Sequence, residues 1–296
     1  MRGGTRSESW RPILAPRHRG HSRYAPINEL DASHVTELTG SAVLVAGASS
    51  GIGRATALAF ARVGARVALL ARREPELRAL AGEIRAESAA NPDSTTKGAD
   101  GAAGTGNATK EPLVLAADLA DGTATRRAVE RVVKLFGRLD VVIYAAGTNT
   151  PRRALTVLEP AVWDELMGAN LTGAYHVTQA SLPAMRAEGG GLLIYLSSAA
   201  VQKPDVSGVA YQATKHGLVG LAHGTFQEER EHGVRTTVLF PGLTETPLLA
   251  KRPVPTPPEI VAKALQPEDV ARACVFVASL PDRVRVPEMQ LVPSAL

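Results

Sequence analysis

A short apolar run, a cluster of three glycines and a helical pattern follow one another near residue 50. This order limits the possible folds more than any other stretch. The run covers residues 41–46, the helical pattern covers residues 54–63, and a second apolar run follows at residues 66–70. This is the order of a βαβ unit, in which two parallel strands flank a helix. Glycines in its first turn let the backbone approach a phosphate, and the N–H groups at the start of the helix bind the anion. The pattern therefore favours a dinucleotide-binding turn at Gly47, Gly51 and Gly53.

The same alternation of apolar runs and helical patterns continues to the end of the chain. It predicts one α/β domain of Rossmann type, a doubly wound parallel sheet in a three-layer α/β/α arrangement. The further strands are expected at residues 112–116, 139–145, 192–196, 234–240 and 288–292. The further helices are expected at residues 74–87, 123–136, 159–185, 210–232 and 267–280. A proline-rich segment, residues 247–258, is interpreted as a semi-rigid loop over a site.

The positive charge of this 296-residue chain belongs to its beginning. Residues 1–24 hold six Arg and one Glu, which leaves 27 basic and 28 acidic residues in the remainder. Residues 1–38 show no sustained periodicity, so we interpret them as a disordered basic extension and residues 39–296 as the folded domain. A nucleic-acid or membrane-surface arm, an organelle transit peptide and an over-long gene model are alternatives for the extension. Because the rest of the chain is neutral, we expect no nucleic-acid partner.

Other features of the sequence indicate where the protein is located and which kinds of segment and site it contains. Residues 88–110 are mostly small and polar, which predicts a disordered surface insertion within the domain. No apolar run approaches the ~20 residues that span a bilayer, and no secretory signal is evident, so we expect a cytoplasmic protein without a membrane partner. The single cysteine, Cys274, excludes an intramolecular disulfide and lies in an apolar helical pattern, which indicates a buried structural thiol. We predict no metal site.

The end of the second strand carries two cations, Arg72 and Arg73. An NAD site usually has an acidic residue here, which binds the 2′-hydroxyl of the ribose. An arginine instead pairs with a 2′-phosphate through two parallel hydrogen bonds. The pair therefore favours NADP(H) over NAD(H), with Arg54 as a further contributor. A solvated charge pair at the start of the next helix is the structural alternative.

A second constellation lies later in the chain. Tyr211 and Lys215 are four residues apart, which places both side chains on one face of a helix. An ammonium beside a phenol favours the phenolate, so we expect Lys215 to lower the pKa of Tyr211 from its usual ~10. Ser198 follows the apolar run at residues 192–196, where a hydroxyl lies at the mouth of a parallel sheet. Such Tyr and Lys pairs also occur by chance on many helices, so a catalytic role depends on the rest of the chain.

Taken in order, the motifs resemble those of the short-chain dehydrogenase/reductase family over roughly residues 38–292. They occur in the order and at the spacings of the family, with Tyr211 thirteen positions after Ser198. Each motif is modest, but the ordered set is specific. The set is Gly47-x-x-x-Gly51-Ile52-Gly53, Asp118-Leu119, Ala145-Ala146-Gly147, Asn170, Ser198, Tyr211-x-x-x-Lys215 and Pro241-Gly242.

The resemblance implies catalytic roles for four residues. Tyr211 is the implied general acid/base. Lys215 lowers its pKa and binds the nicotinamide ribose. Ser198, rather than Ser197, orients the substrate carbonyl, because it has the spacing of the family to Tyr211. Asn170 holds a water that links Lys215 to solvent. The implied activity is hydride transfer between NADP(H) and a small-molecule carbonyl or secondary alcohol.

The resemblance also implies the contacts of the cofactor. The pyrophosphate turn comprises Gly47, Ser49, Ser50, Gly51, Ile52 and Gly53. Asp118 and Leu119 flank the adenine, and Ala146 and Gly147 line the ribose side of the cleft. Pro241, Gly242 and Thr244 fix the amide face of the nicotinamide. Arg72 and Arg73 are added by the argument from charge, and Tyr211 and Lys215 also contact the cofactor.

The chain departs from the family pattern at three places. Tyr144 and Ala145 replace two asparagines, and Ala46 replaces a threonine. Both changes lose side chains that brace the centre of the sheet, so we expect them to affect stability more than chemistry. The C-terminal tail lacks the Asp-Gly-Gly ending of many members, so a homodimer through the helices of Asn170 and Tyr211 is expected as readily as a homotetramer.

Two questions stay open from the residues alone. An NADP(H)-binding regulatory or scaffold protein without turnover is the alternative function. The substrate is not readable, although we expect its pocket at residues 148–151, 199–204 and 243–258. Arg152, Arg153, Lys203 and Lys251 are acid-binding candidates there, with solvated surface as the alternative for each.

Overall fold

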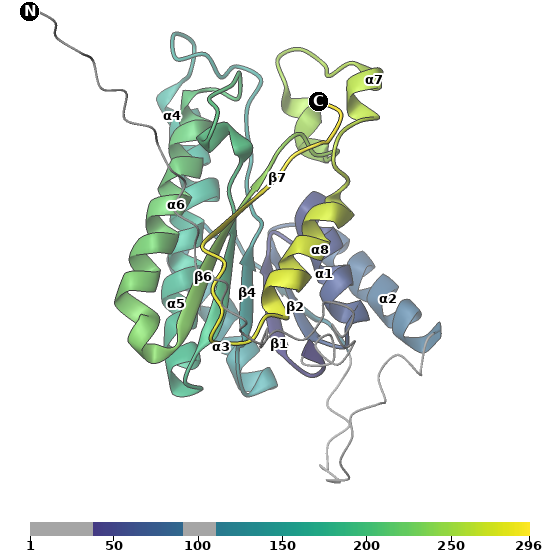
Figure 1. Ribbon diagram of the computed structural model, residues 1–296, viewed down its shortest axis with the longest axis vertical. Helices are drawn as coiled ribbons and strands as arrows, with labels where there is room; N and C mark the ends of the chain where they lie inside the picture. The colour runs from purple at the N-terminus through teal and green to yellow at the C-terminus, as the bar shows by residue number, and fades with distance from the viewer. Residues whose placement is uncertain (1–37, 91–110) are drawn as a thin grey trace, which may run out of the picture. The chain divides into compact units, whose positions relative to one another are not determined.

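The computed structural model describes residues 38–90 and 111–296, and these residues build a parallel sheet of seven strands (Figure 1). The strand order is β3-β2-β1-β4-β5-β6-β7, and each neighbouring pair is parallel. The predicted doubly wound Rossmann-type fold is therefore confirmed. The strands are β1 (Ala42–Ala46), β2 (Arg66–Ala71), β3 (Leu113–Ala116), β4 (Val141–Tyr144), β5 (Gly191–Leu196), β6 (Val234–Pro241) and β7 (Glu288–Leu291).

Helices cover both faces of the sheet, because the side chains of each strand point alternately to the two sides. Val43 and Val45 pack in the apolar core on one face, while Leu44 packs in the core on the other. The first face is covered by α1 (Gly51–Arg62), α2 (Glu74–Ala90) and α8 (Pro267–Ala278). The second is covered by α3 (Gly122–Phe136), α5 (Gly173–Ala187) and α6 (Val209–Glu229). Cys274 of α8 is buried, as predicted.

The direction of winding reverses beside β1. The chain leads from β1 through β2 to β3, and then returns to place β4 on the other side of β1. In open α/β sheets, ligands bind outside the carboxyl ends of the strands at such a reversal. At that point the turn after β1 lies against the segment after β4. A Cβ atom built on Gly47 would lie 2.4 Å from the backbone nitrogen of Ala146, and Gly47 has φ +93. Only glycine fits there.

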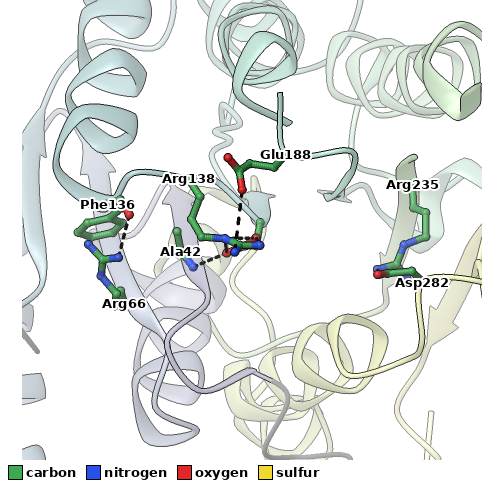
Figure 2. Close-up of polar contacts among 8 residues, drawn as sticks. Ala42, Arg66, Phe136, Arg138, Glu188, Arg235 and Asp282 are labelled. Atoms are coloured by element: carbon green, nitrogen blue, oxygen red, sulfur yellow. Dashed lines mark hydrogen bonds and ion pairs between the residues drawn. The ribbon is translucent and has the colours of Figure 1, made fainter. Parts of the chain in front are cut away.

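Charged side chains brace the opposite, amino end of the sheet (Figure 2). Asp140, just before β4, accepts a 2.8 Å hydrogen bond from the backbone N–H of Ala42 at the start of β1. Arg138 donates to the same carboxylate from 2.8 Å. Arg66 of β2 donates to the carbonyl of Phe136 from 2.8 Å. Arg138 also approaches Glu188, and Arg235 of β6 pairs with Asp282. These contacts join strand starts to helix ends, away from the edge where ligands bind.

The helix predicted over residues 159–185 contains an irregular turn. It consists of α4 (Pro160–Met167), a π-helical turn η4 (Gly168–Thr172) and α5. Single π-helical turns within α-helices are frequent at functional sites, and Asn170 lies in the middle of this one. Asn is mildly unfavourable in a regular α-helix, but Asn170 lies in a π-helical turn. The periodicity of the sequence does not reveal this turn.

Two predicted boundaries differ from the structure. Leu38, the last residue of the predicted extension, is buried in the core and so belongs to the folded domain. Helix α2 runs through Ala90, so residues 88–90 of the predicted insertion are helical. The remainder of both predicted segments, residues 1–37 and 91–110, lies outside the described residues. Within residues 38–90 and 111–296, no helix has the length and apolar character needed to cross a membrane.

Candidate active site

A cleft of about 410 Å³ lies at the carboxyl ends of the central strands. Most of the residues predicted to bind a cofactor line it, although they come from four separate segments of the chain. Their meeting is a consequence of the parallel sheet, which brings every strand end to one edge. The predicted residues in the lining are Gly47, Ser49, Ser50, Gly51, Ile52, Arg72, Arg73, Asp118, Leu119, Ala146 and Gly147.

The turn between β1 and α1 is shaped to accept an anion. A Cβ atom on Gly53 would lie 2.2 Å from the carbonyl oxygen of Gly47, so this glycine permits close packing of helix against strand and does not itself line the cleft. The side chain of Ser50, the N-cap of α1, makes no capping hydrogen bond, and the first turn of α1 carries no acidic residue. The N–H groups at the start of the helix therefore face the cleft without a competing carboxylate. This geometry fits a pyrophosphate.

The two cations after β2 have different surroundings. Arg73 donates hydrogen bonds to the hydroxyls of Ser49 at 3.0 Å and Ser50 at 2.8 Å. Arg72 lines the cleft, is exposed, and has no hydrogen-bond or ion-pair partner among the residues that the structure describes. Arg54 pairs with Glu83 of α2 and does not line the cleft. The structure therefore does not bring Arg54 to the cleft with Arg72 and Arg73.

Ser198, Tyr211 and Lys215 meet beyond the end of β5. The hydroxyl of Ser198 lies near the phenol of Tyr211 and lowers its pKa, and this phenol is buried on the first turn of α6. The Nζ atom of Lys215 lies 5.6 Å from the centre of the Tyr211 ring and donates a 2.8 Å hydrogen bond to the carbonyl of Leu196. Ser197 instead donates to the backbone carbonyl of Lys215 at 2.8 Å, inside the core. The geometry thus distinguishes the two serines and leaves Ser198 beside the phenol.

Burial dominates the electrostatics of this group. It raises the pKa of Tyr211 to about 12. The hydroxyl of Ser198 lowers this pKa, the negative charge of Asp205 raises it, and the positive charge of Arg153 lowers it by a smaller amount. Burial also lowers the pKa of Lys215 to about 8. The prediction that Lys215 lowers the pKa of Tyr211 is therefore wrong for the unliganded protein. The ammonium is 5.6 Å from the ring centre and is hydrogen-bonded elsewhere, so desolvation of the phenol outweighs it.

Asn170 links the turn η4 to the segment after β4. Its Oδ1 atom accepts a 2.7 Å hydrogen bond from the backbone N–H of Thr148. Its Nδ2 atom donates to the carbonyl of Thr148 at 3.0 Å and to the hydroxyl of Thr214 at 3.1 Å. A Cβ atom on Gly147 would lie 3.4 Å from both Asn170 Oδ1 and Lys215 Nζ. The two polar atoms therefore border the same small space next to Gly147.

Tyr144 supplies a brace that the family pattern did not suggest. Its phenol donates a 2.6 Å hydrogen bond to the carbonyl of Ala169 in η4, and its ring is fully buried. Burial raises the pKa of this phenol above its usual value, so it remains protonated. A Cβ atom on Gly173 would lie 2.5 Å from the Tyr144 hydroxyl, so glycine makes room for it. The sheet and η4 are thus joined at the position where the family pattern has an asparagine.

The predicted nicotinamide loop supports the site from behind the cleft. Pro241, Gly242 and Thr244 do not line the cleft. Gly242 donates a 2.7 Å hydrogen bond to Leu291 of β7, and Thr244 donates to the carbonyl of Gly242 at 3.0 Å. These contacts set the direction in which the chain leaves β6. Tyr211 and Lys215 also lie outside the lining, behind it and buried.

A short helical segment, η7 (Pro247–Lys251), covers the cleft and contributes residues that the sequence argument did not assign to the cofactor. A Cβ atom on Gly51 would lie 3.2 Å from Thr246 Cγ2, so this segment crosses close to the pyrophosphate turn. At its other end, Lys251 donates a 2.5 Å hydrogen bond to the hydroxyl of Thr148. The sequence signal that could have identified this segment is Thr246-Pro247, which follows soon after the end of β6. The unassigned lining residues are Ala71, Ala145, Thr148, Ala169, Thr246, Pro247, Leu248 and Lys251.

Comparisons with known proteins agree with this geometry. The family described as short chain dehydrogenase matches residues 41–100 and 88–254. A relative from Thermotoga maritima, 3-oxoacyl-(acyl-carrier-protein) reductase FabG, is 32% identical over 248 residues, which cover 82% of this chain and 92% of the relative. The chain therefore belongs to the short-chain dehydrogenase/reductase family and is an oxidoreductase, as the motifs predicted.

Two solved structures are similar over nearly their full length. The alcohol dehydrogenase from the archaeon Thermococcus sibiricus, complexed with 5-hydroxy-NADP, has a TM-score of 0.72 at 26% identity and covers 86% of this chain and 97% of its own. A metagenomic short-chain oxidoreductase in complex with NADP has a TM-score of 0.67 at 31% identity, with the same coverage of 86% and 97%. These neighbours support a nicotinamide cofactor in the cleft.

Proposed function

We propose that the protein is an NADP(H)-dependent dehydrogenase/reductase that acts on a carbonyl or secondary alcohol of a small molecule, with Tyr211 as the general acid/base. The observation that carries this proposal is the buried Tyr211 phenol, with the Ser198 hydroxyl near it and Lys215 Nζ 5.6 Å from the centre of its ring. These groups adjoin a cleft that fits a dinucleotide. In the proposed reaction, NADP(H) supplies or accepts the hydride, which is the chemistry that the protein itself lacks.

The side chains have separate tasks in this mechanism. The hydroxyls of Ser198 and Tyr211 donate hydrogen bonds to the substrate oxygen, where negative charge develops during reduction. The Tyr211 hydroxyl then transfers its proton to that oxygen. Lys215 and Asn170 restore the proton through a water in the space beside Gly147. In the direction of oxidation, the Tyr211 phenolate takes the proton from the alcohol.

The preference for NADP(H) rests on Arg72. Its guanidinium lines the cleft with no acidic partner within the described part of the chain, while Arg73 is held by two serine hydroxyls. A guanidinium pairs bidentately with phosphate. The two neighbours that were solved with NADP or its 5-hydroxy derivative support the same cofactor. We propose Arg72 as the main contact to the 2′-phosphate and Arg73 as the second.

The test is oxidation of NADPH, compared with NADH, by the purified full chain against a panel of ketones, aldehydes, keto acids and quinones. We expect turnover that prefers NADPH. Tyr211→Phe should abolish turnover and leave NADPH binding within about threefold, because the phenol oxygen transfers the proton. Tyr175→Phe, which changes an exposed tyrosine, is the matched control and should retain activity.

Three outcomes contradict parts of the proposal. Retained turnover in Tyr211→Phe removes Tyr211 from the mechanism. NADPH binding without turnover of any carbonyl favours the regulatory or scaffold alternative. A preference for NADH overturns the role of Arg72.

A further inference from the structure

One carbonyl in the π-helical turn η4 does not have the partner that a regular helix would give it. In an α-helix, the N–H of Gly173 would bond to the carbonyl of Ala169, four residues earlier. In η4 this N–H instead bonds to the carbonyl of Gly168, five residues earlier. The phenol of Tyr144 donates a 2.6 Å hydrogen bond to the carbonyl of Ala169. A side chain of β4 thus takes the place of a backbone donor of the helix.

The surroundings keep the Tyr144 hydroxyl in this position. The side chain is 1% exposed, and burial raises the pKa of its phenol above the usual value, so it remains a donor near neutral pH. A Cβ atom on Gly173 would lie 2.5 Å from the Tyr144 hydroxyl and 2.9 Å from the Cβ atom of Leu119. Only a glycine therefore leaves room for the phenol at this point of the helix.

The carbonyl that Tyr144 binds directly precedes Asn170, which the proposed reaction uses. The carbonyl of Ala169 and the N–H of Asn170 belong to one planar peptide unit, so a rotation of this unit also moves the Asn170 side chain. That side chain is fully buried and bonds both the backbone N–H and the carbonyl of Thr148. It also borders the small space next to Gly147.

We propose that Tyr144 is a positioning residue for proton transfer, whose hydroxyl fixes the π-helical turn and thereby holds Asn170 against Thr148. This inference rests on the proposed function, in which Asn170 takes part in returning a proton to Tyr211. Tyr144 is not among the residues that line the nucleotide cleft, so it acts through Asn170. Tyr144 then affects the chemistry as well as the stability that the sequence alone indicated.

The test substitution is Tyr144→Phe, which removes the hydroxyl and keeps the ring. With NADPH and the panel carbonyl of highest kcat/KM as the probe, kcat should fall about tenfold, because proton return limits the rate when Asn170 is displaced. KM and the Kd of NADPH should stay within about twofold. The first turnover in stopped flow should keep its rate, because Tyr211 starts with its proton. The solvent deuterium isotope effect on kcat should rise.

Tyr195→Phe is the matched control. Tyr195 is the partner of Tyr144 in the register of β4 and β5, and its side chain is also 1% exposed. Its hydroxyl hydrogen-bonds that of Thr178 in α5 at 2.7 Å. The substitution therefore removes an equivalent buried hydrogen bond that does not involve η4. It should cost a similar amount of stability and leave kcat within about twofold.

A double-substitution cycle separates positioning from general destabilisation. Asn170→Ala should lower kcat and preserve the first turnover, as Tyr144→Phe does. If Tyr144 acts through Asn170, adding Tyr144→Phe to Asn170→Ala should lower kcat by less than about a further twofold. If the two losses multiply, Tyr144 does not act through Asn170 and the proposal is wrong.

Hydrogen exchange at the backbone N–H of Thr148 gives a readout that needs no turnover. Asn170 Oδ1 accepts this N–H, so its exchange reports where Asn170 lies. In Tyr144→Phe, exchange at Thr148 relative to Leu44 in β1 should be at least about tenfold faster, and in Tyr195→Phe this ratio should not change. If Tyr144→Phe does not fold, Gly173→Ala displaces the same phenol from the other side and should change the ratio in the same way.

The outcomes separate this proposal from the proposed function. If the probe is reduced but Tyr144→Phe leaves either kcat or the exchange ratio unchanged, the positioning role is wrong and the proposed function stands. If the first turnover slows together with kcat, Tyr144 supports the site as a whole, which also overturns the positioning role. If the wild-type protein reduces no carbonyl, the proposed function fails, and exchange at Thr148 alone decides whether Tyr144 positions Asn170.

Discussion

The buried ammonium of Lys215 should make the unliganded protein more stable as the pH rises through 8. Burial lowers its pKa from 10.5 to about 8 in the folded state. Between those two values the unfolded chain keeps a proton that the folded protein has released. The unfolded state thus binds more protons, so the free energy of unfolding increases with pH across this window. Below pH 8 the full penalty of a buried charge is present.

The size of the effect follows from the two pKa values. From pH 8 to pH 9 the folded state holds, on average, roughly a quarter of a proton on Lys215, and the unfolded state holds nearly a whole one. Each proton of difference changes the free energy of unfolding by about 1.4 kcal/mol per pH unit, so the protein is stabilised by about 1 kcal/mol. Burial raises the pKa of Cys274 from 9.0 to about 12. The thiol therefore ionises at a lower pH in the unfolded chain than in the folded protein, which reduces the gain in the free energy of unfolding by about a third.

The perturbation is Lys215→Met, which keeps the length of the side chain and removes the titration. Urea unfolding at pH 8.0, 8.5 and 9.0, without nucleotide, gives the free energy of unfolding for each protein. The substitution leaves the carbonyl of Leu196 without its partner, so absolute stability is not the readout. The readout is the increment between pH 8 and pH 9, which should be about 1 kcal/mol smaller in the variant, because Cys274 contributes equally to both.

Lys263→Met is the control, since Lys263 is exposed, and it should keep the increment of the wild type. Equal increments in wild type and Lys215→Met would refute the argument. They would mean that the folded protein keeps Lys215 charged up to its ordinary pKa.

Three further predictions follow from single contacts. Arg72→Ala should raise the Kd of NADPH at least about tenfold and that of NADH less than about twofold, because only the former carries a 2′-phosphate; equal effects in fluorescence titrations would exclude this contact, and Arg78→Ala is the control. Arg153→Met should move the pH midpoint of alcohol oxidation upward, because the positive charge of Arg153 lowers the pKa of Tyr211; a midpoint that stays in place or falls contradicts this. Gly47→Ala should prevent stable folding, because its Cβ atom would meet Ala146, whereas Gly137→Ala, at φ +79 with open space around it, should cost only about 1–2 kcal/mol in urea unfolding.

The fold was predictable because its signals are local. The apolar run before Gly47, the glycine cluster that follows it and the regular alternation each depend on a few neighbouring residues. The strand ends then gather the predicted cofactor residues at one edge, as parallel topology requires. Ser198, Tyr211 and Lys215 also come together as expected. The homodimer or homotetramer expected from the tail stays a prediction.

The electrostatics and the irregular elements depend on tertiary packing, which a linear pattern does not contain. The raised pKa of Tyr211 results from surrounding atoms that are distant in sequence. The diversion of Arg54 to Glu83 depends on how α1 lies against α2. The contact of Tyr144 with Ala169 joins residues 25 positions apart. In each case the residue type was visible, and its partner was set by the three-dimensional arrangement.

A π-helical turn at Gly168–Thr172 joins α4 and α5. Because of this turn, the site depends on the exact number of residues in that helical stretch. An α-helix advances by about 100° for each residue, so a π-turn carries one residue more than the regular helix needs. Deleting one residue there would let α4 and α5 join as a regular helix and would turn the side chains on one side of the deletion by that angle. Either Asn170 would leave Thr148, or the face of α5 with Val177 would leave the sheet. Natural or designed relatives of this chain should therefore tolerate substitutions in this turn far better than changes in its length.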